Sequence, residues 1–259
     1  MSNVNTTCNQ GVFEIGLNRP DRLNALNADL LSELTEAINK AKRDPSIRSV
    51  LLYGEGKAFC AGGDLKDFGM DDTNPIEVKE FLQRGHEALI GLYNMEKPVI
   101  VAVHGPAVGA GSNLAFACDI IIADETASFA EIFAKVGALP DMGGLYLLPQ
   151  KIGMHKAAEL VFTGKTIDAN AALEYGLINQ VVAEGQAGEE AKKLAISLAR
   201  GPTKALGLAK RIMHQAPYSS LESVLEMEAM GQANIFQTQD FKEGKQAFIE
   251  KRKAVFKGE

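Results

Sequence analysis

Apolar residues along the first 200 positions follow two spacings, and each spacing predicts one kind of element. Short apolar runs bounded by glycine or polar residues predict strands at 12–17, 49–54, 98–105, 119–124, 128–130 and 176–182. Between them, leucine, isoleucine and alanine recur every three or four residues, which predicts helices at about 28–42, 76–95, 153–164 and 189–200. Strands that alternate with helices are typical of the α/β class with mostly parallel pairing.

The chain changes character at Gly201-Pro202, after which every pattern is helical. Two sequences of capping-box type, Ser219-x-x-Glu222 and Asp240-x-x-Glu243, predict the starts of two of these helices. We therefore expect a core at 1–200 and a helical region at 201–259. This second region is short for an independent domain, so we expect it to pack on the core or on a neighbouring subunit.

Composition and charge are those of an ordinary globular protein. Of the 259 residues, 46% are hydrophobic and 23% charged, and the formal net charge is −6. This acidic balance disfavours non-specific binding to nucleic acid. The first residues lack the basic and apolar segments of a secretion signal, and no apolar run reaches the roughly 18 residues of a membrane span. With an odd number of cysteines, three, these features predict a cytoplasmic protein without a membrane or nucleic-acid partner.

Two glycine-bearing turns, at 56–68 and 104–119, each follow a predicted strand and can open a helix. Backbone N–H groups point outward from such turns, so two that converge would form an oxyanion hole, a pair of donors for a developing negative charge on oxygen. Neither turn has the Gly-Lys-Ser/Thr of a phosphate-binding loop or the spaced glycines and downstream acid of a dinucleotide site. Taken singly, each turn is also explained by close packing.

One carboxylate lies in an unusual setting. Asp141 follows a proline, precedes Gly143-Gly144 and has mostly apolar neighbours between Phe129 and Pro149. Pro-Asp-x-Gly is common in turns, and Asp is a good N-cap for a helix that the next residues can open. The local pattern leaves two interpretations open: Asp141 as a turn or cap residue, or as a catalytic group.

Four linked segments resemble the enoyl-CoA hydratase/isomerase (crotonase) superfamily. In order, they are "KAFCAGGDLKDF", "PVIVAVHGPAVGAGSNLAFACDIIIAD", "FAKVGALPDMGGLYLLPQKIG" and "EYGLINQVV", and the terminal "FKEGKQAFIEKRKAVFKG" also matches. The resemblance covers residues 10–257. It implies a spiral of ββα units with a C-terminal helical region, assembly as a homotrimer or a dimer of trimers, and an acyl-CoA thioester as substrate. Coenzyme A would be part of that substrate, and the resemblance implies no permanently bound cofactor and no metal.

The resemblance also assigns residues position by position. The backbone N–H groups of Gly63 and Ala110 would hold the thioester oxygen, with Asp141 as the proton-transferring acid. A larger set would contact the substrate. Within it, Ala61 lies beside the adenine, Lys66 and Arg22 near the CoA phosphates, Asp64 directly after the first donor, His86 and Phe133 at the acyl group, and Phe248 and Lys251 at a neighbouring subunit's CoA.

Two departures from the family pattern bear on the reaction. Hydratases of this family hold the attacking water with two glutamates, and this chain has Asn113 and Phe133 at those positions. Neither side chain can act as an acid or a base, which disfavours hydration by that route. Glu131 would share the face of Phe133 on a strand but not on a helix, and we do not adopt it as a candidate. Asp141 is then the matched acid, and an apolar wall containing Phe133 would raise its pKa.

The resemblance therefore predicts an enoyl-CoA isomerase, closest to the Δ3,Δ2-enoyl-CoA and 1,2-epoxyphenylacetyl-CoA isomerase types. The dehalogenase branch uses the same acid as a nucleophile, and His86 falls where its histidine lies, but this chain contains no tryptophan for the aromatic site. A hydratase and a CoA-binding or RNA-binding relative without catalysis stay as alternatives, although the acidic charge disfavours RNA. The acyl chain would be selected by residues around 69–75 and 138–146.

Overall fold

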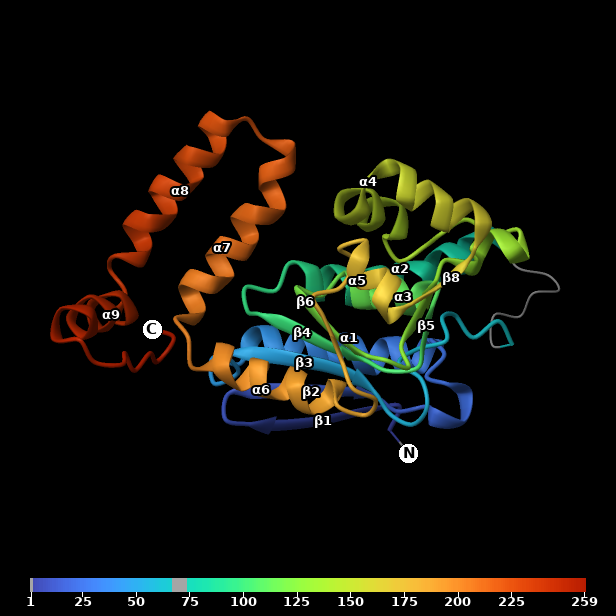
Figure 1. The fold of residues 1–259 in the computed structure, drawn as a ribbon, viewed down its shortest axis with the longest axis horizontal. Coiled ribbons are helices and arrows are strands. Elements are labelled where there is room, and N and C mark those ends of the chain that lie inside the picture. Colours follow the sequence, from blue (N-terminus) through green and yellow to red (C-terminus); the bar gives the residue numbers. More distant parts are fainter. Residues whose placement is uncertain (1, 67–73) are drawn as a thin grey trace.

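The computed structural model describes residues 2–66 and 74–259 and contains two β-sheets (Figure 1). The larger sheet has the order β1-β2-β3-β4-β6-β9, with strands Val4–Asn9, Val12–Leu17, Ser49–Gly54, Val99–Val103, Ile120–Asp124 and Gln180–Val182. The smaller sheet has the order β5-β7-β8, with strands Pro106–Val108, Ser128–Ala130 and Thr166–Asp168. Pairing is parallel except between β1 and β2 and between β7 and β8, which confirms the predicted α/β class.

Successive turns of the chain supply one strand to each sheet and then a helix. One turn consists of β4, β5 and α3 (Ala110–Phe116). The next consists of β6, β7, the short 3-10 helix η2 (Ile132–Val136) and α4 (Gly144–Thr163). Because β3, β4 and β6 are parallel neighbours, the segments that follow them leave the same edge of the large sheet. The predicted acyl site lies among these segments.

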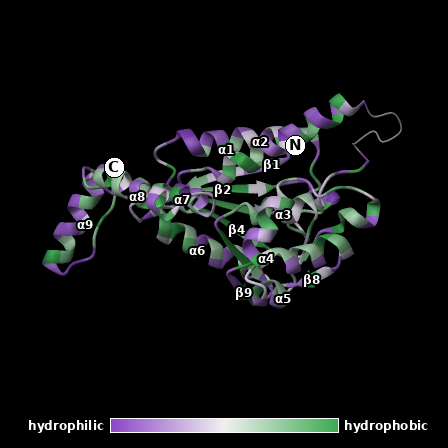
Figure 2. Ribbon diagram, turned by 90° about the horizontal axis from the view of Figure 1, so that it is seen from above, coloured by the Kyte–Doolittle hydropathy of each residue, from purple (hydrophilic) through white to green (hydrophobic). Residues whose placement is uncertain are grey.

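Helices cover both faces of the large sheet (Figure 2). On one face lie α1 (Ala28–Arg43) and α2 (Pro75–Tyr93), and on the other lies α6 (Ala187–Ala199). Side chains alternate along β3, so that Val50 and Leu52 belong to the core under α1 and Leu51 to the core under α6. Four alanines of α6 are fully buried there, which lets the helix approach the sheet closely. None of the described helices is long and apolar enough to cross a membrane.

The predicted helices and strands are confirmed, with some corrections. The strand predicted at 176–182 is only Gln180–Val182, because α5 (Ala169–Glu174) and its C-terminal turn take up the preceding residues. The helix predicted at 153–164 starts earlier, at Gly144, includes Pro149 and is kinked at Gly153. Strand β1 was not predicted: only its first residue is buried, so its sequence has no apolar alternation. Strands β5 and β8 have three residues each and are too short for a periodic signal.

Both predicted helix caps are wrong by one or two residues. Ser220, not Ser219, caps α8 (Leu221–Ile235) by accepting the N–H of Ser223. Thr238 caps α9 (Gln239–Glu250). Asp240 has another role, since its carboxylate accepts the N–H groups of Lys257 and Gly258 at 2.6 and 2.8 Å and ties the end of the chain to α9.

Helices α7 (Thr203–Gln215), α8 and α9 extend away from the core as an arm (Figure 1). The predicted boundary at Gly201-Pro202 falls between the end of α6 and the start of α7. Large apolar side chains are exposed on α8, directly after it and on α9: Leu221, Leu225, Met230, Phe236, Phe248 and Ile249. Such a surface suits association with a second copy of the chain. Assembly as a homotrimer or a dimer of trimers stays a prediction.

A buried ion pair fastens the arm to the core. Lys210 of α7, only 5% exposed, donates to the Asp119 carboxylate at 2.9 Å and to the backbone oxygen of Leu92 at 3.1 Å. Asp119 also accepts the N–H of Val99, at the start of β4. Helix α7 packs closely against the backbone at Glu96, and a Cβ on Gly207 would clash with the oxygen of Glu96.

Replacing Lys210 by Met is expected to lower the free energy of unfolding by about 3–5 kcal/mol, because Asp119 stays largely buried and loses its counter-charge. Arg211→Met is the matched control, since its ion pair with Glu96 is exposed on both sides and should contribute less than about 1 kcal/mol. Urea denaturation of the two variants measures both values. Equal losses would show that Lys210 has no special role in fastening the arm.

Candidate active site

The two glycine-bearing turns lie side by side and are hydrogen-bonded to each other. The N–H of Cys60 donates to Pro106 O at 3.2 Å, and the N–H of Val108 donates to Cys60 O at 2.9 Å. Gly62 has a φ of +92°, and a Cβ there would lie 2.7 Å from Val108 O. A Cβ on Gly111 would clash with Cys60 O. Glycine is therefore required at both positions for the two backbones to approach this closely.

Two backbone N–H groups remain unused where these turns meet. Among the described residues, neither the N–H of Gly63 nor that of Ala110 has a hydrogen-bond acceptor. Ala110 is the first residue of α3, where an N–H has no acceptor within the helix. The two turns are close here, because a Cβ on Gly62, the residue before Gly63, would lie 3.7 Å from the N of Ala110. Such a pair can bind one oxygen atom that carries negative charge.

An ion pair fixes the first turn from behind. Asp64 is 8% exposed, and its carboxylate lies 3.0 Å from a guanidinium nitrogen of Arg19. The same guanidinium donates to Ala25 O, and Asp64 also accepts the N–H of Lys66. Asp64, predicted to contact substrate, is thus held within the protein, and Arg19 is a residue that the sequence analysis missed.

Asp141 lies in the turn that leads into α4, and it is not the cap of that helix. The N-cap is Gly143, and no side chain caps the helix, so the cap interpretation is wrong. Met142 and Gly143 have φ angles of +45° and +72°, a conformation that few residues other than glycine adopt. Met142 is buried, and a Cβ on Gly85 of α2 would lie 2.7 Å from its sulfur. This close packing holds the strained turn in place.

The environment of Asp141 shifts its pKa upward. Removal from water raises the pKa of the carboxyl to about 6, and the positive charge of His86 on α2 opposes part of this rise. One carboxylate oxygen, Oδ1, is buried and has no hydrogen-bond partner among the described residues. The predicted residue His86 is thus near enough to influence Asp141 electrostatically, and a carboxyl with a pKa of about 6 suits proton transfer.

Asn113, at one of the two hydratase glutamate positions, connects the walls of this site. Its Nδ2 donates to the backbone oxygen of Asp141 at 2.9 Å and lies 3.3 Å from a carboxylate oxygen of Glu131. A Cβ on Gly144 would lie 2.5 Å from the same nitrogen, so glycine is required at the start of α4. Asn113 is fully buried on α3, directly after the turn that carries Ala110.

Glu131, which the sequence analysis did not adopt as a candidate, lies next to Asn113 in the folded protein. It lies between β7 and η2, so it follows neither the strand nor the helix pattern that was considered, and its side chain turns inward toward Asn113. It is 3% exposed, and burial raises its pKa to about 8. The hydrogen bond from Asn113 lowers this pKa, and the charge of Asp141 raises it further. Asp141 is therefore not the only acid near the acyl site.

Phe133 lies at the other hydratase glutamate position and covers the second turn. A Cβ on Gly109, the residue before Ala110, would lie 3.3–3.9 Å from atoms of the Phe133 ring. The ring therefore forms an apolar wall beside one of the two unused N–H groups.

The residues predicted to contact CoA lie outside this buried part. Ala61 is half-buried, whereas Arg22 and Lys66 are exposed. Phe248, 86% exposed, and Lys251 lie on or next to α9, at the far end of the arm, so they do not reach the site of their own chain. Their contact with a neighbouring subunit's CoA stays a prediction. Residues 69–75 were predicted to help select the acyl chain, and 69–73 of these lie outside the described residues.

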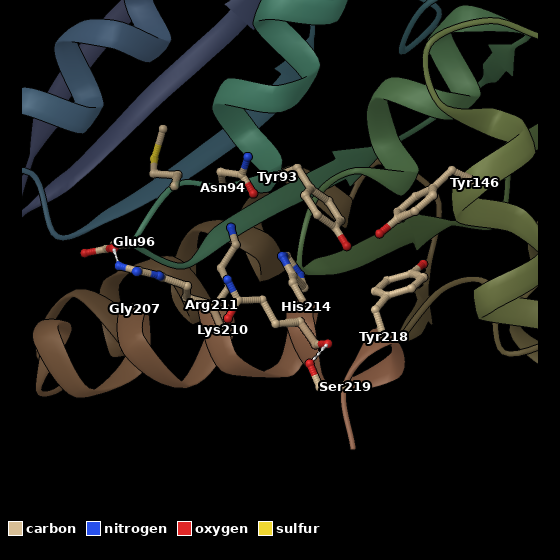
Figure 3. Close-up of a pocket in the computed structure, with 12 residues that line it drawn as sticks. Tyr93, Asn94, Glu96, Tyr146, Gly207, Lys210, Arg211, His214, Tyr218 and Ser219 are labelled. Atoms are coloured by element: carbon tan, nitrogen blue, oxygen red, sulfur yellow. Dashed lines mark hydrogen bonds and ion pairs between the residues drawn. The ribbon is translucent and has the colours of Figure 1, made fainter. Parts of the chain in front are cut away.

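A separate cleft of about 610 Å³ lies between the C-terminal end of α2, α4 and α7 (Figure 3). Tyr93 stacks on His214 within it, with ring centroids 3.9 Å apart, and Tyr146 stacks on Tyr218. Two of its cations, Lys210 and Arg211, are already ion-paired. Of the residues predicted from the sequence, Tyr146, the last of the range 138–146, lines this cleft, whereas Asp141 does not.

The two buried thiols are poor nucleophiles. Burial raises the pKa of Cys60 and of Cys118 to about 12, so both stay protonated at neutral pH. In the described part of the chain, no cluster of three or more His, Cys, Asp and Glu side chains could hold a metal ion.

Comparison with known proteins gives one consistent family. The family described as "Enoyl-CoA hydratase/isomerase" matches residues 7–259. The chain is 39% identical over 251 residues to the 1,2-epoxyphenylacetyl-CoA isomerase of Escherichia coli (strain K12), covering 96% of each chain. It is 36% identical to the short-chain-enoyl-CoA hydratase of Clostridium acetobutylicum, covering 93% of this chain and 92% of the other.

Solved structures agree with these sequence relatives. An enoyl-CoA hydratase from Bacillus anthracis superimposes with a TM-score of 0.94 at 35% identity, over 99% of this chain and all of the other. An enoyl-CoA hydratase described as putative, from Streptomyces coelicolor A3(2), superimposes with a TM-score of 0.95 at 33% identity, over 99% of this chain and 94% of the other. The fold predicted from the sequence, a crotonase-type spiral with a C-terminal helical region, is confirmed.

Proposed function

This chain belongs to the enoyl-CoA hydratase/isomerase family, and we propose that within it the protein is an enoyl-CoA isomerase. It would move the double bond of a 3-enoyl-CoA thioester to position 2. Coenzyme A enters and leaves as part of the substrate. The relative named 1,2-epoxyphenylacetyl-CoA isomerase supports an isomerase, and the relative named short-chain-enoyl-CoA hydratase keeps a second reaction in view.

In this mechanism Asp141 takes a proton from C2 of the bound thioester, and the electrons move onto the thioester oxygen. The N–H groups of Gly63 and Ala110 stabilise the negative charge of the resulting dienolate. Asp141 then returns the proton to C4 as the electrons move back, which leaves the double bond between C2 and C3. One acid suffices, because the proton that leaves one carbon is the proton that arrives at the other.

The observation that carries this proposal is the environment of Asp141. It is a half-buried carboxyl with a pKa of about 6, and its backbone oxygen contacts Asn113, which with Phe133 occupies the two positions of the hydratase glutamates. At neutral pH such a group is mostly ionised, and because its pKa is raised, it accepts a proton more readily than an exposed aspartate. Phe133 supplies an apolar wall, which favours proton transfer between carbons over attack by water.

The rim of the site suits the CoA part of the substrate. We propose that Arg22 and Lys66, both exposed, lie near the phosphates, and that Ala61 lies beside the adenine. Asp64 would act indirectly, because its ion pair with Arg19 fixes the turn that presents Gly63.

Hydration of a 2-enoyl-CoA is the second candidate, and one observation favours it. Asn113 contacts the carboxylate of Glu131 and the backbone oxygen of Asp141, and the charge of Asp141 raises the pKa of Glu131, so two acids approach this site, as in the water-adding reaction. They come, however, from other positions of the chain than the two glutamates of hydratases. The isomerase remains the better supported reaction because Phe133 occupies one of those positions.

The purified protein should be incubated with a 3-enoyl-CoA and, separately, with crotonyl-CoA. We expect fast conversion of the first to the 2-enoyl isomer and slow or no hydration of the second. Chromatography of the thioesters measures both reactions. Fast hydration of crotonyl-CoA without isomerisation would contradict the isomerase proposal. Binding of both thioesters without reaction would indicate a relative that has lost catalysis.

A further inference from the structure

Three buried oxygen atoms around Asn113 lack a hydrogen-bond donor. They are Asn113 Oδ1, Glu131 Oε1 and Asp141 Oδ1, and none has a partner within the described residues. A buried acceptor without a donor is unfavourable, and an ionised carboxylate without one is more so. A proton on one of the two carboxyl groups would bring the missing donor into this cluster.

Glu131 is the better of the two places for that proton. It is 3% exposed and deeper than Asp141, which is only half-buried. Among the described residues, the one polar contact of its carboxyl is the neutral amide of Asn113, whereas a positive charge on His86 would stabilise the ionised form of Asp141. Lys135, on the short helix η2 that follows Glu131, packs beside Gly164 and is exposed. Among the described residues, the charged group that acts on the Glu131 carboxyl is thus Asp141, and His86 acts in turn on Asp141.

We infer that Glu131 is a positioning residue that works as a neutral carboxylic acid: it holds Asn113, and through it Asp141, while keeping a second negative charge out of the site. This inference rests on the proposed isomerase function and adds a residue to it. Asn113 donates to the backbone of Asp141, so the orientation of its amide sets where that turn lies. An ionised Glu131 would repel the dienolate that forms during the reaction, because like charges in a buried site interact strongly.

The pH dependence follows from the two carboxyl groups. Asp141 has to be ionised to accept a proton, so kcat should rise as the pH passes through about 6. Glu131 has to be neutral, so kcat should fall again as the pH passes through about 8. The wild-type profile is then bell-shaped, with its maximum between these values.

Replacing Glu131 by Gln is expected to remove the alkaline fall, because glutamine keeps the shape of the neutral acid and cannot ionise. At pH 7 the kcat of Glu131→Gln should stay within about threefold of the wild type, and at pH 9 it should be about tenfold higher, since about one wild-type molecule in ten is then neutral. Glu125→Gln, at an exposed position in the turn after β6, is the matched control and should keep the wild-type profile.

Infrared spectroscopy reads the protonation state of Glu131 independently of any activity. The wild type at pH 7 should show a band of a protonated carboxyl that is absent in Glu131→Gln and disappears toward pH 9. An ionised Glu131 at pH 7, or a Glu131→Gln variant that isomerises substrate with the same alkaline fall as the wild type, would overturn the inference. If the wild type isomerises no 3-enoyl-CoA, the proposed function fails, whereas the infrared band still decides the state of Glu131.

Discussion

The Asp141→Asn variant should isomerise 3-enoyl-CoA about 10²–10⁴-fold more slowly than the wild type, with KM nearly unchanged. This is the usual range for removing a general acid–base group. Asparagine has almost the same size and keeps the backbone oxygen that Asn113 contacts, so the turn and the binding site should persist. The loss should therefore fall on kcat, because the missing group acts only when the proton moves. Stopped-flow or coupled assays of the thioesters measure both constants.

Two further variants separate the function of Asp141 from its position. Asp141→Glu keeps the acid but moves it by one methylene, and it should restore part of the rate if the carboxyl carries the proton. Asp21→Asn removes an exposed acid from η1 and should leave the rate unchanged. An Asp141→Asn variant with wild-type kcat would show that another group transfers the proton, and Glu131 would be the first to test.

The fold was largely predictable because its core obeys simple periodicity. The strands β3, β4 and β6 are buried on both faces and read as continuous apolar runs, and the helices between them show apolar spacing of three and four. Strand β1 was not predicted for the opposite reason, since it is an edge strand with one buried residue and has no apolar pattern. The caps were wrong because Ser219 and Ser220 are adjacent and equally suited, so only the backbone geometry distinguishes them.

The sequence located the two turns that carry Gly63 and Ala110, but not all of the side chains that surround them. The glycines around Gly63 and Ala110 are visible in the sequence because close approach of two turns requires them. Glu131 was considered but not adopted, because it lies at the junction between a strand and a 3-10 helix, where neither periodicity says which way a side chain points. Arg19 was missed because its partner Asp64 is 45 positions away in the chain, and an ion pair at that separation leaves no local pattern.

Replacing Ala110 by Pro should lower kcat/KM by about 10²–10³-fold, because proline has no N–H and would remove one of the two proposed donors to the thioester oxygen. The substitution suits the local backbone. Ala110 is the first residue of α3, a position where proline is tolerated, and Gly109 before it has a ψ of −121°, outside the α region that proline disfavours in its predecessor. The corresponding loss of transition-state stabilisation is about 2.7–4 kcal/mol.

The control for this substitution is Ala110→Gly, which keeps the N–H and removes only the methyl group, so its kcat/KM should remain within a few-fold of the wild type. Circular dichroism and the melting temperature of both variants show whether α3 and the core persist. A folded Ala110→Pro variant with wild-type kcat/KM would rule out Ala110 as a donor. A loss of similar size in both variants would point to packing against Phe133 rather than to the N–H, because the Phe133 ring lies directly over the neighbouring Gly109.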